Sequence, residues 1–148
     1  MKLLKLYNWI AGSLSDFSKP FQENEALYKQ ARAFWGKLEN NSMIIFLICI
    51  VLGIALAIYY YKPYNDRPGR HYTLKHWLIF IFITFFLTFA VTFGFEYLAV
   101  TPKLSGAMGL EAKIALGNAI YASILYFIIS VFWCNFCPTN ACKIFKIR

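Results

Sequence analysis

Three long apolar runs constrain the fold of this chain more than any other feature of its sequence. The first covers residues 43–61 without a charge, the second covers 77–100 with Glu96 as its single charge, and the third covers 114–133. At 1.5 Å per residue, about 20 helical residues cross the roughly 30 Å hydrocarbon core of a bilayer. The runs therefore predict an all-α polytopic membrane protein, with a three-helix transmembrane domain over residues 43–134.

The segment before the first run has an amphipathic pattern. Residues 1–42 predict one or two interfacial helices, the first over about 2–15 and the second starting at Pro20. A cleaved signal peptide is the competing interpretation of residues 1–14, although polar residues interrupt their apolar stretch. The second helix carries an apolar stripe that we expect to face the bilayer or a partner: Leu27, Ala31, Phe34, Trp35 and Leu38.

The ends of the runs carry residues that stop helices or prefer the membrane interface. Residues 40–42, Asn-Asn-Ser, are expected to break the amphipathic helix and cap the first span. The tyrosines at 59–61 predict an interfacial aromatic belt, and Trp77 and Trp133 predict similar anchors for the second and third spans.

The charge balance narrows the class of partner. The chain has 15 Lys and Arg against 7 Asp and Glu, a net charge of +8, while 59% of residues are hydrophobic and 15% are charged. Basic residues this sparse make nucleic acid an unexpected partner and suit the surface of a lipid bilayer. The first loop concentrates four of them for contact with lipid head groups or a partner: Lys62, Arg67, Arg70 and Lys75.

Orientation in the membrane is predicted from the basic residues near the span ends. Those residues favour the cytoplasmic side for the first loop and the C-terminal tail. The basic residues of the whole N-terminal segment favour the opposite orientation, because moving them across a membrane without a signal peptide is unfavourable.

The third run separates into two faces when its residues are placed at 100° intervals. One face is bulky and apolar and is expected to contact lipid. The other is expected to contact protein and consists of Ala115, Asn118, Ala119, Ala122, Ser123, Tyr126 and Ser130. Small residues at four-residue spacing form ridges that allow close helix packing: Ala115, Ala119 and Ser123 here, Cys49, Gly53 and Ala57 in the first run, and Ala90 and Gly94 in the second.

A polar row also runs along the second span. It repeats every fourth residue as Thr84, Thr88, Thr92 and Glu96. The row is expected either to pack inside the protein, with threonines bonded to their own helix, or to line an ion or proton path. Glu96 and Asn118 lie at similar depths near one membrane face, so we expect them to be within reach of each other.

The tail over residues 135–148 is short, basic and rich in cysteine. Together with Cys134, which precedes it, the tail contains the pattern C-x2-C-x4-C, formed by Cys134, Cys137 and Cys142. These cysteines could bind zinc, with His71 or His76 of the first loop as the fourth ligand. Reduced, lipid-modified or disulfide-bonded cysteines are the competing interpretations. The sequence shows no hydrolytic triad or paired-carboxylate pattern, so we expect neither an enzyme nor a cofactor other than this zinc.

Three functions are compatible with these patterns. The first is a small anchoring or assembly subunit that packs tightly against other membrane protein subunits or copies of itself. The alternative is a homo-oligomeric ion channel or holin-like permeabilising effector, lined by the Thr84–Glu96 row or the Asn118 face. The third is a metal- or redox-linked membrane enzyme subunit that uses the tail cysteines; the spans contain no histidine to bind haem.

Overall fold

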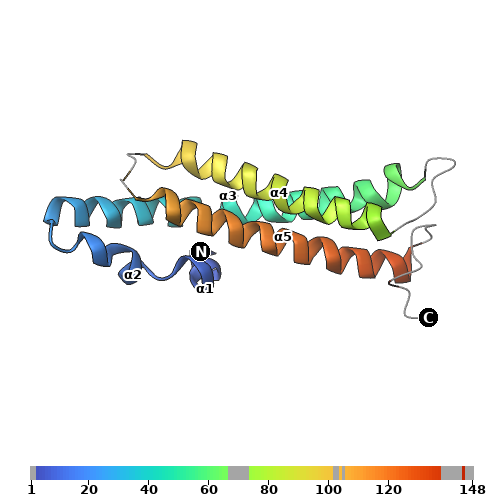
Figure 1. Ribbon diagram of the computed structural model, residues 1–148, viewed down its shortest axis with the longest axis horizontal. Helices are drawn as coiled ribbons and strands as arrows, with labels where there is room; N and C mark the ends of the chain where they lie inside the picture. The colour runs from blue at the N-terminus through green and yellow to red at the C-terminus, as the bar shows by residue number, and fades with distance from the viewer. Residues whose placement is uncertain (1–2, 67–73, 102–103, 105, 138–144, 146–148) are drawn as a thin grey trace. The chain divides into compact units, whose positions relative to one another are not determined.

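A computed structural model of the chain describes residues 3–66, 74–101, 104, 106–137 and 145 (Figure 1). Within these ranges the regular structure is helical, and no strand occurs. The elements in order are η1 (Leu3–Tyr7), α1 (Asn8–Ala11), α2 (Leu14–Ser18), η2 (Lys19–Phe21), α3 (Glu25–Tyr59), η3 (Tyr60–Tyr64), α4 (Leu74–Ala99) and α5 (Met108–Phe136). Helices α3, α4 and α5 are long and apolar enough to cross a membrane, which confirms the prediction of three such helices in an all-α chain.

The N-terminal segment is more broken than the sequence predicts. The expected helix over residues 2–15 stops at Gly12, whose φ of +79° is accessible to glycine at little cost. Ser13 then caps α2: its hydroxyl accepts from the N–H of Asp16, and its own N–H donates to Asp16 Oδ2 at 2.9 Å. Hydrogen bonds from the Ser13 hydroxyl and from the Ser13 backbone hold the pKa of Asp16 below the usual 3.8.

The second predicted helix starts later and continues much further than expected. Pro20 lies in η2, and α3 starts at Glu25, where the side chain of Asn24 accepts from the N–H of Ala26 at 3.0 Å. The expected break at residues 40–42 is wrong, because α3 runs through them to Tyr59.

Two of the three polar residues there bond to their own helix. Asn41 Nδ2 donates to the carbonyl of Lys37 at 3.0 Å, and Ser42 Oγ donates to the carbonyl of Glu39 at 2.6 Å. Bonds of this kind satisfy a polar side chain inside a helix without ending it. The segment predicted as a separate amphipathic helix is therefore the first half of α3.

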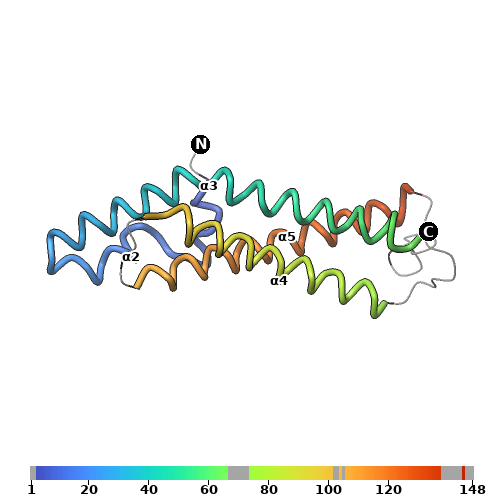
Figure 2. The backbone as a smooth tube through the Cα atoms, turned by 90° about the horizontal axis from the view of Figure 1, so that it is seen from above, coloured from blue at the N-terminus to red at the C-terminus, as the bar shows by residue number. Residues whose placement is uncertain are grey.

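The chain groups into two compact units, and each is described by itself. Unit 1 comprises residues 1–48 and 89–118, and unit 2 comprises residues 49–88 and 119–148. In unit 1 the N-terminal segment lies beside the first part of α3 and the first part of α5, as both Figure 1 and Figure 2 show. The ring of Phe17 lies 6.1 Å from that of Phe34 and 6.0 Å from that of Trp35.

These contacts change the interpretation of the apolar stripe on α3. Four of its five residues are buried within the chain, namely Ala31, Phe34, Trp35 and Leu38, while Leu27 remains exposed. The expectation that the whole stripe faces the bilayer or a partner is wrong, because the chain's own N-terminal segment packs against it.

Unit 2 is built around an aromatic cluster. Its buried members are Ala57, Tyr60, Tyr61, Trp77, Phe80, Tyr126 and Cys134. Tyr60 and Tyr61 are 0% and 1% exposed, and Trp77 is 7% exposed, so these residues do not form the expected interfacial belt. Tyr59, at 45% exposure, is the one of the three tyrosines that faces outward.

Helices α3 and α5 approach closely in unit 2 at Gly53. A Cβ atom added there would lie 3.1 Å from the carbonyl oxygen of Ala122 and 3.2 Å from Leu125 Cδ2. Gly53 belongs to the predicted small-residue ridge of the first span, together with Cys49 and Ala57, which are both buried. Small residues of this kind bring two helix backbones close enough for extensive van der Waals contact.

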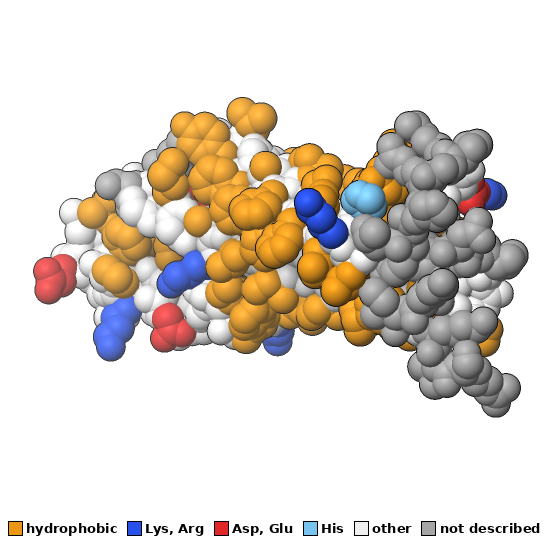
Figure 3. Space-filling model, turned by 45° about the vertical axis from the view of Figure 1, so that its right-hand side comes forward, with side chains coloured by type: hydrophobic (Ala, Val, Ile, Leu, Met, Phe, Trp, Pro, Cys, Tyr) orange, Lys and Arg blue, Asp and Glu red, His pale blue; other side chains and the backbone are white. Residues whose placement is uncertain are grey.

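Helix α4 buries a row of polar side chains and exposes several of its large apolar ones. Thr84, Thr88, Thr92 and Glu96 are each 0% exposed, whereas Phe82, Phe86 and Leu98 are 59%, 64% and 78% exposed. Apolar side chains likewise cover much of the described surface drawn in Figure 3. This arrangement is the reverse of a soluble helix and suits a hydrocarbon environment.

Candidate functional site: a polar hub around Asn118

Asn118 of α5 joins three other elements of unit 1 through hydrogen bonds. Its Nδ2 donates to the backbone carbonyl of Ile45 in α3 and to Oγ1 of Thr92 in α4, each at 2.8 Å. Its Oδ1 accepts from the hydroxyl of Tyr7 in η1, also at 2.8 Å. Both amide hydrogens and the carbonyl oxygen are thus used, in a site where Asn118 is 0% exposed. We call these four residues the Asn118 hub.

A glycine next to the hub makes room for Tyr7. A Cβ atom added at Gly117 would lie 3.0 Å from Tyr7 Cδ1 and 3.2 Å from Ile10 Cγ2. The absence of a side chain at Gly117 therefore lets the aromatic ring lie against α5, with its hydroxyl at the amide of Asn118. The sequence analysis missed Tyr7, because nothing in the local pattern of residues 1–42 indicates which part of the spans they contact.

The remaining predicted polar residues occupy defined places. Ser123 is half-buried. The other intramembrane polar residues predicted from the sequence are buried, and these are Thr84, Thr88, Thr92, Glu96, Asn118, Tyr126 and Ser130. Thr84 donates to the carbonyl of Phe80 at 2.8 Å, and Ser123 donates to the carbonyl of Ala119 at 2.9 Å. These hydroxyls satisfy themselves on their own helices, as expected for packed residues.

Ser130 links two helices in unit 2. Its hydroxyl donates to the carbonyl of Tyr126 at 2.8 Å and accepts from the indole N–H of Trp77 at 3.1 Å. Trp77 was predicted as an interfacial anchor, and its N–H instead bonds within the chain. A buried indole needs such a partner, since it has no water to bond with.

Glu96 is an acidic side chain among these buried polar residues, and like the hydroxyl of Thr88 its carboxyl group has no described hydrogen-bond partner. Within the described part of the chain, neither of its carboxyl oxygens has a hydrogen-bond partner, although the residue is 0% exposed. No described hydrogen bond joins it to Asn118, which instead bonds to Thr92, one helical turn earlier. A second buried carboxyl, that of Glu111 in the first turn of α5, is 4% exposed.

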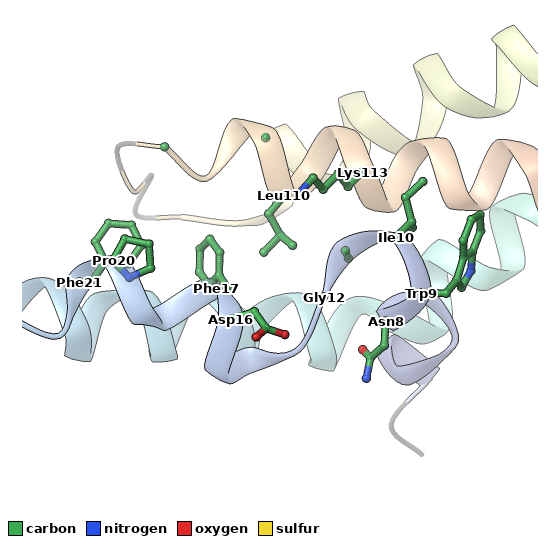
Figure 4. A pocket seen from close by; sticks show the side chains of 13 residues that line it. Asn8, Trp9, Ile10, Gly12, Asp16, Phe17, Pro20, Phe21, Leu110 and Lys113 are labelled. Carbon is green, nitrogen blue, oxygen red and sulfur yellow. The ribbon is translucent and has the colours of Figure 1, made fainter.

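A cavity lies between the N-terminal segment and the start of α5 in unit 1 (Figure 4). It has a volume of about 750 Å³ and mixed walls, with Asp16 and Lys113 among mostly apolar residues. Figure 4 shows Phe17 of α2 and Leu110 of α5 pointing into the same space. Trp9, which also lines the cavity, is 57% exposed. A cavity with these walls can accommodate an amphipathic molecule.

The cysteine tail is described only in part. Cys134 is disulfide-bonded, and Cys137 is a free thiol; Cys142 and His71 lie outside the described residues. His76 packs edge-on against Tyr64, with ring centroids 5.8 Å apart. The described residues contain no group of three or more metal-ligating side chains. The zinc site stays a prediction, which would require reduction of Cys134, because a disulfide sulfur is not a thiolate ligand.

The basic residues of the first loop are also only partly described. Lys62 and Lys75 are exposed, whereas Arg67 and Arg70 lie outside the described residues. Chemically, the hub can hold four segments of unit 1 together, and the exposed lysines can contact anionic groups.

Comparison of the whole chain with protein-family models, with curated proteins and with solved structures finds no match.

Proposed function

We propose that the chain is a small integral membrane protein that anchors or assembles a larger membrane complex through tight helix–helix packing. The observation that carries this proposal is the direction of the side chains on the long helices. A row of polar side chains is buried within the chain, some of them hydrogen-bonded as in the Asn118 hub, while large apolar side chains remain exposed along α3, α4 and α5. Such helices offer apolar faces to lipid and to other membrane helices.

Photo-crosslinking tests this proposal with one exposed position on each long helix. A photoreactive amino acid is placed in turn at Val51, Phe86 and Phe132, which are 58%, 64% and 56% exposed. We expect one position to give a discrete adduct of defined mass with another membrane protein, and the other two to give lipid adducts. The latter serve as internal controls, since a partner covers one face and lipid covers the rest.

The channel alternative makes a different prediction for the same protein. Uniform lipid adducts at all three positions contradict the assembly role, and so does a ladder of copies of this chain. Ion flux in proteoliposomes that is lost in a Thr88→Val variant then supports a homo-oligomeric channel, because the Thr88 hydroxyl has no hydrogen-bond partner among the described residues.

The side of the membrane on which the tail lies is a further part of the proposal. Basic residues near the spans favour the cytoplasm, whereas the disulfide at Cys134 favours an oxidising compartment. We propose the oxidising compartment for the tail, because the cytosol keeps cysteines reduced. With three spans, the N-terminal segment then lies on the cytoplasmic side.

Labelling of Cys137 tests this orientation. Cys137 is a free, partly exposed thiol, whereas Cys49, the other free cysteine among the described residues, is buried. We expect a membrane-impermeant maleimide to label intact cells or spheroplasts at Cys137, and a Cys137→Ser variant to lose the label. Labelling that requires lysis of the cells places the tail in the cytoplasm instead.

A further inference from the structure

Glu96 is a buried carboxyl group without a compensating partner. It is 0% exposed, and no described donor bonds to either of its oxygens. An isolated carboxylate in a low-dielectric environment is strongly unfavourable, so buried acids are paired, bind a cation or carry a proton. Asn118, Thr84 and Thr92 show that this chain satisfies other buried polar groups. Glu96 therefore calls for an explanation in terms of a ligand.

A second acid acts on Glu96 from a different helix. Glu111 of α5 is 4% exposed, and its charge interacts unfavourably with that of Glu96 of α4. Two neighbouring carboxylates cannot both be ionised at low cost, and sharing one proton removes the repulsion. Glu111 lies in the first turn of α5, where the helix dipole stabilises negative charge, so Glu96 is the better position for the proton.

A cavity of about 160 Å³ lies beside one member of this pair. Its walls include Glu111 but not Glu96, so Glu111 is the member of the pair that faces the cavity. The volume is sufficient for several water molecules, at about 30 Å³ each in liquid water. Other elements contribute Phe34 from α3 and Leu104 from the turn before α5, which carry no charge, and α4 contributes Tyr97.

We propose that Glu96 and Glu111 form a proton-binding site that holds one proton at neutral pH, taken up from water and returned to it through the cavity beside Glu111. The proton neutralises one of two negative charges, and no other bond is formed or broken. The site lies within unit 1 of a single chain, so it does not depend on the proposed assembly role. We assign a proton rather than a metal cation as its ligand, because the described residues contain no group of three or more His, Cys, Asp or Glu side chains that could hold a metal ion.

Infrared spectroscopy of the reconstituted protein tests this site directly. The carbonyl stretching band of a protonated carboxyl group is separate from the amide bands and from the bands of carboxylates. We expect the folded wild-type protein to show such a band at neutral pH, with the intensity of one group per chain. Glu96→Gln should abolish it, and Glu111→Gln should preserve it while shifting the pH at which it disappears.

Two controls keep the result interpretable. Glu25→Gln alters an acid whose side chain is 81% exposed and should leave the band unchanged. Protection of the buried Cys49 thiol from a thiol reagent shows that each variant is folded. A folded wild-type protein without the band at neutral pH overturns the proposal, and so does a band that persists in Glu96→Gln. A band that appears only when Na⁺ is removed also overturns it, because Na⁺ is then the ligand.

Discussion

Replacing Asn118 with leucine is expected to lower the stability of the protein by roughly 2–4 kcal/mol, the largest effect of a single substitution in unit 1. The estimate takes about 0.7–1.3 kcal/mol for each of the three hydrogen bonds, between the average from double-mutant cycles in a membrane protein and the values from model peptides. The variant removes bonds to Tyr7, Ile45 and Thr92 together and leaves the Tyr7 hydroxyl buried without its acceptor. The readout is thermal unfolding in detergent, followed by the reaction of the buried Cys49 with a fluorogenic maleimide.

Asn41→Leu is the matched control for this substitution. Asn41 also donates from Nδ2 to a backbone carbonyl, but its acceptor, Lys37, lies on the same helix. All variants are made in a parent protein that carries Cys137→Ser, which removes the accessible thiol. We expect the Asn41→Leu variant to unfold at a temperature close to that of this parent. If Asn118→Leu and Asn41→Leu unfold at the same temperature, the hub does not hold unit 1 together.

Gly53→Val is expected to produce the largest effect in unit 2. The first added carbon would lie 3.1 Å from the carbonyl oxygen of Ala122, a backbone atom that cannot move without shifting α5. Overpacking of this kind lowers stability by about 1–3 kcal/mol. The same maleimide assay measures it, and Gly53→Ala should give a smaller decrease because it adds only the first carbon.

Gly94 provides the control for the glycine series. A Cβ atom added there meets nothing within 4 Å, so Gly94→Ala should be tolerated and is expected to stabilise α4 through its higher helix propensity. Equal effects at Gly53 and Gly94 contradict the close packing of α3 against α5 in unit 2. The two glycines look alike in sequence, and only the structure distinguishes them.

The long helices could be predicted because their pattern is local. The four-residue row from Thr84 to Glu96 and the two faces of the third run follow from helical geometry, and the structure buries those polar residues. The break expected at residues 40–42 failed because the buried stripe of α3 continues through Ser42 to Ile45. Packing along that stripe overrides the turn preference of Asn and Ser.

The missed parts of the site depend on contacts between distant segments. Tyr7 reaches Asn118 only because the chain turns at Gly12 and Gly117 leaves space for its ring. Glu111 was counted in the second loop, since the third span was predicted to start at residue 114, whereas α5 starts at Met108. A boundary error of six residues thus concealed the carboxyl group that acts on Glu96.

The Asn118 hub also determines when the fold can be completed during synthesis. Tyr7 and Asn118 are 111 residues apart, which at about 5–20 residues per second corresponds to roughly 5–20 s of translation. Before α5 emerges from the ribosome, Tyr7 and Thr92 have already been synthesised. The Asn118 amide that connects them has not. Insertion of α3 and α4 therefore cannot rely on the hub, and a chain that lacks Asn118 should fail at its last assembly step rather than its first.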